Sequence, residues 1–280
     1  MENKNFGIIL GFGHMGHLHA SHLNALGVRI SAGDGERECL EFLSSDFLKR
    51  TFPVKPFALI ATPASSHFEY VKRALESRLD VFVEKPLSTS KEQAQTLIQM
   101  AMDSEKLLFV GHCENFNPAF SRFKSKFLVA QEIAQLQSLV FIRHHPVSVR
   151  GRDVSEIWDI GVHDFGLLHE LQKSAPQIVW DSVAVQFDEN RESVKTERSI
   201  RAEFLSKEGK TFVLNADLGC WRQPGTSLFQ DPLFAEEREF LRLRTLPWKI
   251  QRQQVLSNWE TALFAVQMAE SYTGMPKSPK

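Results

Sequence analysis

The sequence has little of what marks secreted or membrane-bound proteins. Its 280 residues include three cysteines, Cys39, Cys113 and Cys220, which are odd in number and lack CxxC spacing. That usage fits a reducing compartment better than a disulfide scaffold. No run approaches the roughly 18 apolar residues that span a bilayer, and the apolar run behind the polar N-terminus is too short for a signal peptide. We therefore expect a cytoplasmic protein without membrane association.

An excess of charge of one sign is also missing. The 33 lysines and arginines balance 34 aspartates and glutamates, which gives a net charge of −1. Because nucleic-acid-binding proteins present a basic patch, we expect no nucleic-acid partner. The proportions of 42% hydrophobic and 24% charged residues are ordinary for a globular protein, and this length suits one large or two ordinary domains.

What the first third of the chain does contain is a regular alternation of strand-like and helix-like segments. Short apolar runs predict strands at 6–10, 28–32, 57–61, 81–83 and 107–110, and helical spacing predicts helices at 14–25, 36–48, 67–77 and 91–103. Strands that alternate with helices over short connections predict an α/β fold with a doubly wound parallel sheet.

After Gly111 the pattern changes. Helices are predicted at 118–129, 158–171, 234–243 and 258–272, and strands at 136–143, 178–187, 197–206 and 210–218. The last three strands alternate apolar and polar residues, as half-buried antiparallel strands do. We therefore expect a domain boundary near residue 118, with domain 1–118 followed by an α+β domain at 119–280.

A glycine-rich loop, Gly11-Phe12-Gly13-His14-Met15-Gly16, joins the first strand to the first helix. In this context the first glycine permits a tight turn, the second lets the backbone approach a pyrophosphate, and the third lets helix and strand pack closely. The helix N-terminus adds free N–H groups for the phosphates. A plain strand-turn-helix is the alternative, but the context favours a dinucleotide site.

Asp34 ends the second strand, about 20 residues beyond the loop, where a carboxylate can bind the ribose hydroxyls. A carboxylate there repels a 2′-phosphate, so NAD is favoured over NADP. Arg37 keeps NADP open, because an arginine can accommodate that phosphate.

Four histidines, His14, His17, His19 and His22, fall on the first helix. Spacings of three on one helix face could suggest metal ligands. No acidic or cysteine partner is near in sequence, so we expect no metal site. His19 and His22 are expected to pack or form hydrogen bonds at the helix surface.

The tripeptide Glu84-Lys85-Pro86 directly follows a predicted strand. Such a tripeptide is most often a solvated loop, but the carboxyl ends of parallel strands form the ligand crevice of this kind of sheet. Lys85 beside an oxidised nicotinamide should have a lowered pKa and could exchange protons near neutral pH. Pro86 fixes the backbone after the lysine, and a cis peptide bond there would aim the side chain.

Asp159 and His163 form a second candidate pair, four residues apart on a predicted helix. One helical turn places both on the same face. An imidazole can exchange a proton with a hydroxyl, and a carboxylate can orient it. The alternative is a capped helix start, with Asp164 as the cap and His163 as a structural hydrogen-bonding residue.

Five motifs together resemble the Gfo/Idh/MocA oxidoreductase family, in family order and over most of the chain. They are the glycine loop, Ala61-Thr62-Pro63 with Ser66-His67, Val83-Glu84-Lys85-Pro86-Leu87, Gly111-His112 with Asn115-Phe116-Asn117-Pro118, and Asp159-x-x-x-His163-Asp164. The resemblance implies an N-terminal Rossmann domain and a second domain with a mostly antiparallel open sheet. The exposed face of that sheet often forms oligomer contacts in the family, so we expect a homo-dimer or tetramer.

The resemblance also implies roles for individual residues. Lys85, Asp159 and His163 would line the site where a sugar or polyol hydroxyl is oxidised. The residues implied to bind the cofactor, besides the glycine loop, Asp34 and Arg37, are Ala61, Thr62, Pro63, His67, Glu84 and Lys85.

Within the family, the motif at 111–118 and Gly161-Val162-His163-Asp164 look most like a branch that oxidises C3 of UDP-N-acetylglucosamine. Asp231-Pro232-Leu233, followed by Glu236, Glu237 and Phe240, adds to this likeness. It implies a nucleotide-sugar substrate and a 3-keto product for an aminotransferase, in lipid A or surface polysaccharide synthesis. Asn115 stands where the branch usually has arginine. The residues implied to bind substrate, besides Lys85, Asp159 and His163, are Asn115, Phe116, Asn117, Arg150 and Arg152.

Three other functions stay open from the sequence. Some relatives of this family use tightly held NAD to cleave glycosides through transient oxidation, and a hydrolase of that kind would release no net NADH. A non-catalytic nucleotide-binding protein is the second, although it would not need Lys85, Asp159 and His163 together. Another sugar or polyol dehydrogenase of the same family is a further alternative.

Overall fold

The computed structural model describes residues 5–144, 154–155, 157–190, 196–219 and 228–273. The chain divides into two units. The first joins Met1–His112 to Leu233–Lys280, and the second is Cys113–Pro232. Each unit is described by itself.

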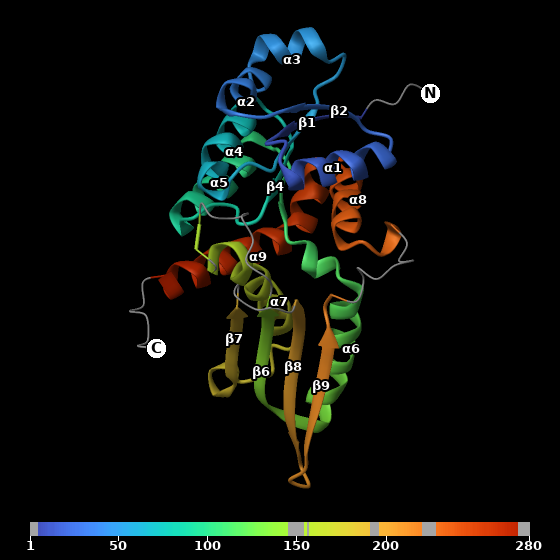
Figure 1. Cartoon of the computed structure of the whole chain (residues 1–280), viewed down its shortest axis with the longest axis vertical. Helices are drawn as coiled ribbons and strands as arrows, with labels where there is room; N and C mark the ends of the chain where they lie inside the picture. Colours follow the sequence, from blue (N-terminus) through green and yellow to red (C-terminus); the bar gives the residue numbers. More distant parts are fainter. Residues whose placement is uncertain (1–4, 145–153, 156, 191–195, 220–227, 274–280) are drawn as a thin grey trace. The chain divides into compact units, whose positions relative to one another are not determined.

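The first unit is built on a parallel sheet (Figure 1). Its strands, in the order β2-β1-β3-β4-β5, are all paired in parallel. Their bounds are β1 Phe6–Leu10, β2 Arg29–Gly33, β3 Phe57–Ile60, β4 Val81–Glu84 and β5 Leu108–Gly111. The inner strands are buried over nearly their whole length, as expected for a sheet covered on both faces. Because β1 lies between β2 and β3, the switch point where ligands bind is at the carboxyl end of β1.

Helices α1 (His14–Ala25), α4 (His67–Glu76) and α5 (Lys91–Ser104) follow strands as predicted. The single helix predicted over 36–48 is wrong, because two helices occur there, α2 (Glu36–Phe42) and α3 (Ser45–Thr51). The cause is a local cap: the Ser44 side chain accepts a hydrogen bond from the Phe47 N–H at 3.2 Å and begins a new helix.

The last two helices complete the first unit. They are α8 (Pro232–Arg244) and α9 (Trp248–Thr273), and α8 lies beside α1 in Figure 1. The Phe240 ring packs edge-on at 5.1 Å from the Phe57 ring and 5.5 Å from the Phe82 ring. The Trp259 indole donates to the Leu108 carbonyl at 2.7 Å. The extent of the first unit therefore differs from the predicted domain 1–118, because these buried contacts join helices from the end of the chain to the parallel sheet.

The second unit is a mixed sheet with two long helices. Its elements are α6 (Pro118–Ile133), β6 (Ala134–His144), a π-helical turn Ile157–Gly161 that continues as α7 (Val162–Ser174), β7 (Ala184–Asn190), β8 (Glu197–Ser206) and β9 (Thr211–Asp217). The sheet order is β7-β6-β8-β9. Two of the three pairings are antiparallel and β6–β7 is parallel, since α7 lies in the crossover between those two strands. The expected α+β domain with a mostly antiparallel sheet is confirmed.

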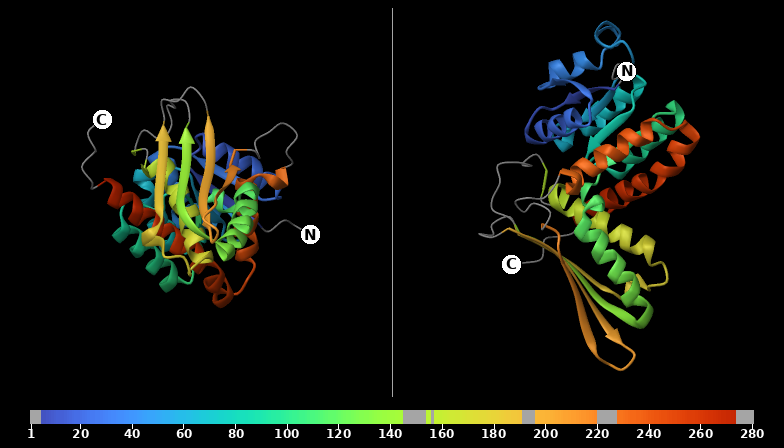
Figure 2. Two further views of the ribbon diagram at one scale, coloured as in Figure 1. Left: turned by 90° about the horizontal axis from the view of Figure 1, so that it is seen from below. Right: turned by 90° about the vertical axis from the view of Figure 1, so that its right-hand side faces the viewer.

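Figure 2 shows that α6 and α7 lie on the same face of this sheet. Residues pointing to that face, such as Phe141, Ile200 and Phe204, are fully buried. The strand predicted at 178–187 begins later than expected, because Trp180–Ser182 forms a 3-10 turn first. Within the described parts of both units, no helix combines the length and apolar character needed to cross a bilayer.

Candidate cofactor and catalytic site

The glycine loop lies at the carboxyl end of β1 and begins α1. At Gly11, where φ is +88°, a Cβ atom would lie 2.7 Å from the backbone of Ala61 and Thr62. At Gly16 it would lie 2.2 Å from the Gly11 carbonyl oxygen. Gly13 is different, because it is exposed and a Cβ there would have no atom within 4 Å. Two glycines are thus required for packing, and the third leaves open space in front of the helix N-terminus, which fits a bound pyrophosphate.

Asp34 lies at the end of β2 beside this loop. Its carboxylate accepts a hydrogen bond from the Phe12 N–H at 3.3 Å, and the Asp34 N–H donates to Glu38 at 3.0 Å. Asp34 and Arg37 are both exposed. The structure therefore holds a second carboxylate, Glu38, next to the aspartate predicted to bind ribose, and this adds to the charge that disfavours a 2′-phosphate.

The segment Ala61-Thr62-Pro63, which is predicted to contact the cofactor, follows β3 at the same edge of the sheet. The Ala61 N–H donates to the Leu10 carbonyl at 2.8 Å. The His67 ring, which is buried, lies 2.9 Å from the Thr62 carbonyl and 2.7 Å from the Pro86 carbonyl. Burial lowers the pKa of His67, and the ring connects these two loops from inside the unit.

Lys85 follows β4 at the same edge. Between Val81 and Ser88, a segment that the structure describes throughout, every residue except Lys85 is buried. The Lys85–Pro86 peptide bond is cis, as the sequence suggested. The unit therefore places the glycine loop, Asp34, Thr62 and Lys85 at one edge of the sheet, with Lys85 as a partly exposed functional group at the end of a buried strand.

The Glu84 carboxylate forms an ion pair inside the first unit. Its Oε1 lies 2.9 Å from His19 Nε2, and the other ring nitrogen of His19 lies 2.5 Å from Glu237 Oε1. His22 Nδ1 lies 3.1 Å from the second oxygen of Glu237. Burial lowers the pKa of His19, but hydrogen bonds and charges from Glu237 and Glu84 outweigh it and raise the pKa to about 9.

The expectation that His19 and His22 lie at the helix surface is therefore wrong. Both are buried, and their acidic partner Glu237 lies more than 200 residues away in sequence, so local spacing could not reveal it. One signal was available: Glu236 and Glu237 are adjacent acids that directly follow the apolar run Leu233-Phe234-Ala235. In the described residues, no group of three or more histidines, cysteines or acids is arranged to hold a metal ion.

Asp159 and His163 lie in the second unit, on one continuous helical stretch. Asp159 is in the π-helical turn and His163 is in the first turn of α7. Both side chains are partly exposed, while Trp158, Ile160 and Val162 are buried. A π-helical turn inside a helix often marks a functional position. Asp164 is not the cap of this helix, because it is buried in α7 and its carboxylate accepts a hydrogen bond from Arg143 at 2.7 Å.

Asn117 is fully buried at the start of α6. Its Oδ1 caps the helix by accepting from the Ala119 N–H at 2.9 Å. Its Nδ2 donates to Glu114 at 2.7 Å and to the Leu218 carbonyl at 2.8 Å. Both amide protons of Asn117 are thus used inside the unit, where the side chain positions the start of α6. The resemblance had implied instead that Asn117 binds the substrate.

Glu114 connects this cap to two arginines. It forms ion pairs with Arg198 and, at 3.6 Å, with Arg143. Asn115 and Phe116 are partly exposed on the same 3-10 turn, Cys113–Phe116. The other residues implied to bind substrate, Arg150 and Arg152, lie outside the described residues.

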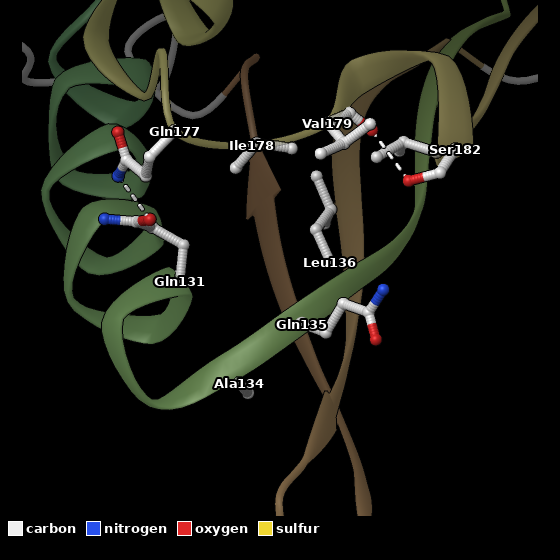
Figure 3. Close-up of a pocket in the computed structure, with 9 residues that line it drawn as sticks. Gln131, Ala134, Gln135, Leu136, Gln177, Ile178, Val179 and Ser182 are labelled. Atoms are coloured by element: carbon white, nitrogen blue, oxygen red, sulfur yellow. Dashed lines mark hydrogen bonds between the residues drawn. The ribbon is translucent and has the colours of Figure 1, made fainter.

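A separate hollow lies in the second unit (Figure 3). It has a volume of about 220 Å³ and is lined by Gln131, Ala134, Gln135, Leu136, Gln177, Ile178, Val179, Ser182 and Val183. None of the predicted site residues lines it. The hollow is therefore distinct from the candidate site.

Comparisons with known proteins show which proteins the chain is similar to in sequence. Residues 53–112 match the family described as "Oxidoreductase family, NAD-binding Rossmann fold", GFO_IDH_MocA. Among curated proteins, the chain is 26% identical to the UDP-N-acetylglucosamine 3-dehydrogenase of Acidithiobacillus ferrooxidans, over 60% of this chain and 54% of that protein. It is 25% identical to the scyllo-inositol 2-dehydrogenase (NAD(+)) of Bacillus subtilis, over 45% of this chain and 41% of that protein. The chain spans about half the length of the curated relatives it matches.

Solved structures show the same fold. GenD2 from gentamicin A biosynthesis, in complex with NAD, has a TM-score of 0.71 at 18% identity and covers 97% of this chain and 93% of its own. The UDP-N-acetylglucosamine 3-dehydrogenase GnnA from Acidithiobacillus ferrooxidans has a TM-score of 0.64 at 18% identity, covering 95% of both chains. The chain therefore has the fold of these structures, and its residues 53–112 are similar to the NAD-binding Rossmann domain of the Gfo/Idh/MocA oxidoreductase family.

Proposed function

We propose that this protein is an NAD-dependent dehydrogenase that oxidises a ring hydroxyl of a sugar to a ketone. The observation that carries the proposal is the position of Lys85. It is partly exposed at the end of a buried parallel strand, on the sheet edge that also holds the glycine loop and Asp34. Ligands of this fold bind at that edge.

The residues of the chain have separate tasks in this proposal. The backbone of Gly11–Gly16 and the N-terminus of α1 hold the pyrophosphate, and Asp34 holds the ribose hydroxyls. NAD, when bound, accepts the hydride. The hydroxyl proton leaves through Lys85 or His163, which are groups able to exchange protons, and Asp159 orients them. Single variants of Lys85 and His163 decide which of the two residues takes the proton.

The substrate we propose is a UDP-linked N-acetylamino sugar oxidised at C3. The relative from Acidithiobacillus ferrooxidans supports this choice, as does the motif from Gly111 to Pro118. The 3-keto product would suit an aminotransferase, in the synthesis of lipid A or a surface polysaccharide. A cyclic polyol is the second candidate, because several relatives are inositol dehydrogenases.

The test is NADH formation with a panel of UDP-sugars and inositols. We expect Lys85→Ala and His163→Ala each to lower kcat/KM by about a hundredfold or more, since each removes a group that moves or holds the proton. Lys210→Ala, in an exposed position beside the β8–β9 turn, is the matched control and should behave as wild type.

The outcomes of this test are distinct. Unchanged turnover in both variants would contradict the assignment of the site. Activity on inositols alone would replace the substrate but keep the chemistry. Glycoside cleavage without net NADH would identify the hydrolase alternative.

The setting of the enzyme is part of the same proposal. We expect it to act in the cytoplasm as a homo-dimer or tetramer, with a small-molecule substrate. Size-exclusion chromatography with light scattering tests the oligomer, and a monomer at micromolar concentration would contradict it.

A further inference from the structure

Two buried histidines contact the residues on either side of Lys85 in the sequence. On one side His19 contacts the Glu84 carboxylate at 2.9 Å, and the second oxygen of Glu84 accepts the Lys85 N–H at 3.2 Å. On the other side His67 contacts the Pro86 carbonyl at 2.7 Å. The residues before and after the functional lysine are therefore both fixed from inside the unit.

The two histidines differ in their partners. His67 faces two uncharged backbone carbonyls, and its burial lowers its pKa. Both ring nitrogens of His19 face carboxylate oxygens, one of Glu84 and one of Glu237. A neutral imidazole carries one N–H and could donate to only one of them. With both contacts short, His19 is an imidazolium that donates to two carboxylates.

We infer that His19 is a positioning residue for Lys85: as a cation between Glu237 and Glu84, it fixes the Glu84 carboxylate so that its free oxygen holds the Lys85 backbone. This inference rests on the proposed function of Lys85. It gives His19, the third of the four histidines on α1, a role other than metal binding or packing at the helix surface.

The contacts of His19 explain how a change at this residue would affect Lys85. The cluster joins α1, the end of β4 and α8 through fully buried side chains. Glu84 is the last residue of β4, and its carboxylate is charged, because the contact with His19 lowers its pKa in spite of burial. Removal of the His19 charge leaves Glu84 buried without its cation, so the carboxylate must turn toward water or take up a proton. Either change releases the Lys85 backbone.

The first experiment needs no substrate. The Lys85 amine is labelled with an amine-reactive acetylating reagent in the full-length protein, and its rate is followed by mass spectrometry relative to Lys210. Acetylation of the Lys85 side chain forms an amide and releases the reagent's carboxylate leaving group. We expect His19→Gln to change the Lys85 rate relative to Lys210 by about threefold or more, because a released strand end alters the exposure of the amine.

The second experiment compares kcat with NAD affinity. His19→Gln should lower kcat about ten- to a hundredfold, since a displacement of about 1 Å at a catalytic group has that effect. The Kd for NAD, measured by fluorescence, should stay within about threefold, because the glycine loop itself is unchanged. Glu237→Gln keeps the contact between His19 and Glu84, and should give a smaller change of the same kind. Ser21→Ala, exposed on the same helix, is the control.

A Lys85 labelling rate and a kcat that both match wild type in His19→Gln would overturn the inference. Equal losses in kcat and in NAD affinity would also overturn it, since they would show a general disturbance of α1. If His19→Gln does not fold, Glu237→Gln decides by the same readouts. If Lys85→Ala keeps full activity, the proposed function fails, while the labelling rate still tests the role of His19.

Discussion

At the level of single residues, the glycines of the loop provide a matched pair of tests. Gly16→Ala should destabilise the protein by about 3 kcal/mol, because its Cβ would lie 2.2 Å from a backbone oxygen that cannot move easily. Gly13→Ala should change the free energy of unfolding by no more than about 0.5 kcal/mol, because that Cβ meets no atom. Urea unfolding at constant pH measures both.

The same pair separates folding from cofactor binding. Gly13→Ala should weaken NAD binding about tenfold or more while it leaves the fold intact, since a methyl group would occupy the space assigned to the pyrophosphate. Titration of NAD by fluorescence measures this. Wild-type affinity in Gly13→Ala would show that the pyrophosphate does not approach this backbone.

At the level of elements, the contact that joins α1, β4 and α8 makes stability depend on pH. The pKa of His19 is about 9 in the folded protein against 6.5 as the ordinary value. A pKa that is raised on folding stabilises the protein fully below 6.5, and this stabilisation disappears as pH rises through 9. The difference corresponds to a few kcal/mol, on the order of 3, at one pKa unit per 1.4 kcal/mol.

The measurement is urea unfolding at about pH 6 and about pH 10 for wild type and His19→Gln. We expect wild type to lose more stability than the variant between these values, and the two curves to converge at high pH. Parallel curves for the two proteins would show that His19 does not carry the charge assigned to it.

Most of the elements follow from local patterns. The strand predicted at 6–10 matches β1 because it is a continuous apolar run, and the helix predicted at 14–25 matches α1 because the glycine loop precedes it and Gly27, with a φ of +78°, follows it. Ser44 broke the predicted helix at 36–48 through one side-chain cap. A cap of that kind competes with helical periodicity and is hard to weigh from sequence when apolar residues continue on both sides.

The site could be predicted only as far as local sequence reaches. The positions of Lys85 and Asp34 at one edge of the sheet could be predicted, because each follows a strand and the ends of parallel strands share one edge. The partners of His19 were not, because Glu237 arrives from a helix near the other end of the chain. Asn117 was assigned to substrate from the resemblance of its motif, whereas its burial and three hydrogen bonds depend on tertiary contacts.

At the level of the whole molecule, the chain begins and ends in the same unit. The parallel sheet from residues 6–111 receives α8 and α9 after the second unit has been completed. The Asn258 side chain accepts a hydrogen bond from the Val110 N–H at 2.9 Å and donates one to the Val110 carbonyl at 2.8 Å. It therefore pairs with both backbone groups of this residue in β5. The N-terminal strands therefore depend on side chains more than 140 residues away.

This dependence predicts where a C-terminal substitution acts. Phe240 is 1% exposed and packs against Phe57, Phe82 and Phe109. Phe240→Ala should cost about 3–5 kcal/mol, the usual loss for a buried phenylalanine. The loss should be visible by hydrogen–deuterium exchange as faster exchange in peptides that contain β3 and β4, although the substitution lies in α8. Leu256→Ala, at a position 41% exposed on α9, is the control and should leave exchange in those strands unchanged. Faster exchange confined to α8 in Phe240→Ala would show that the parallel sheet is stable without the C-terminal helices.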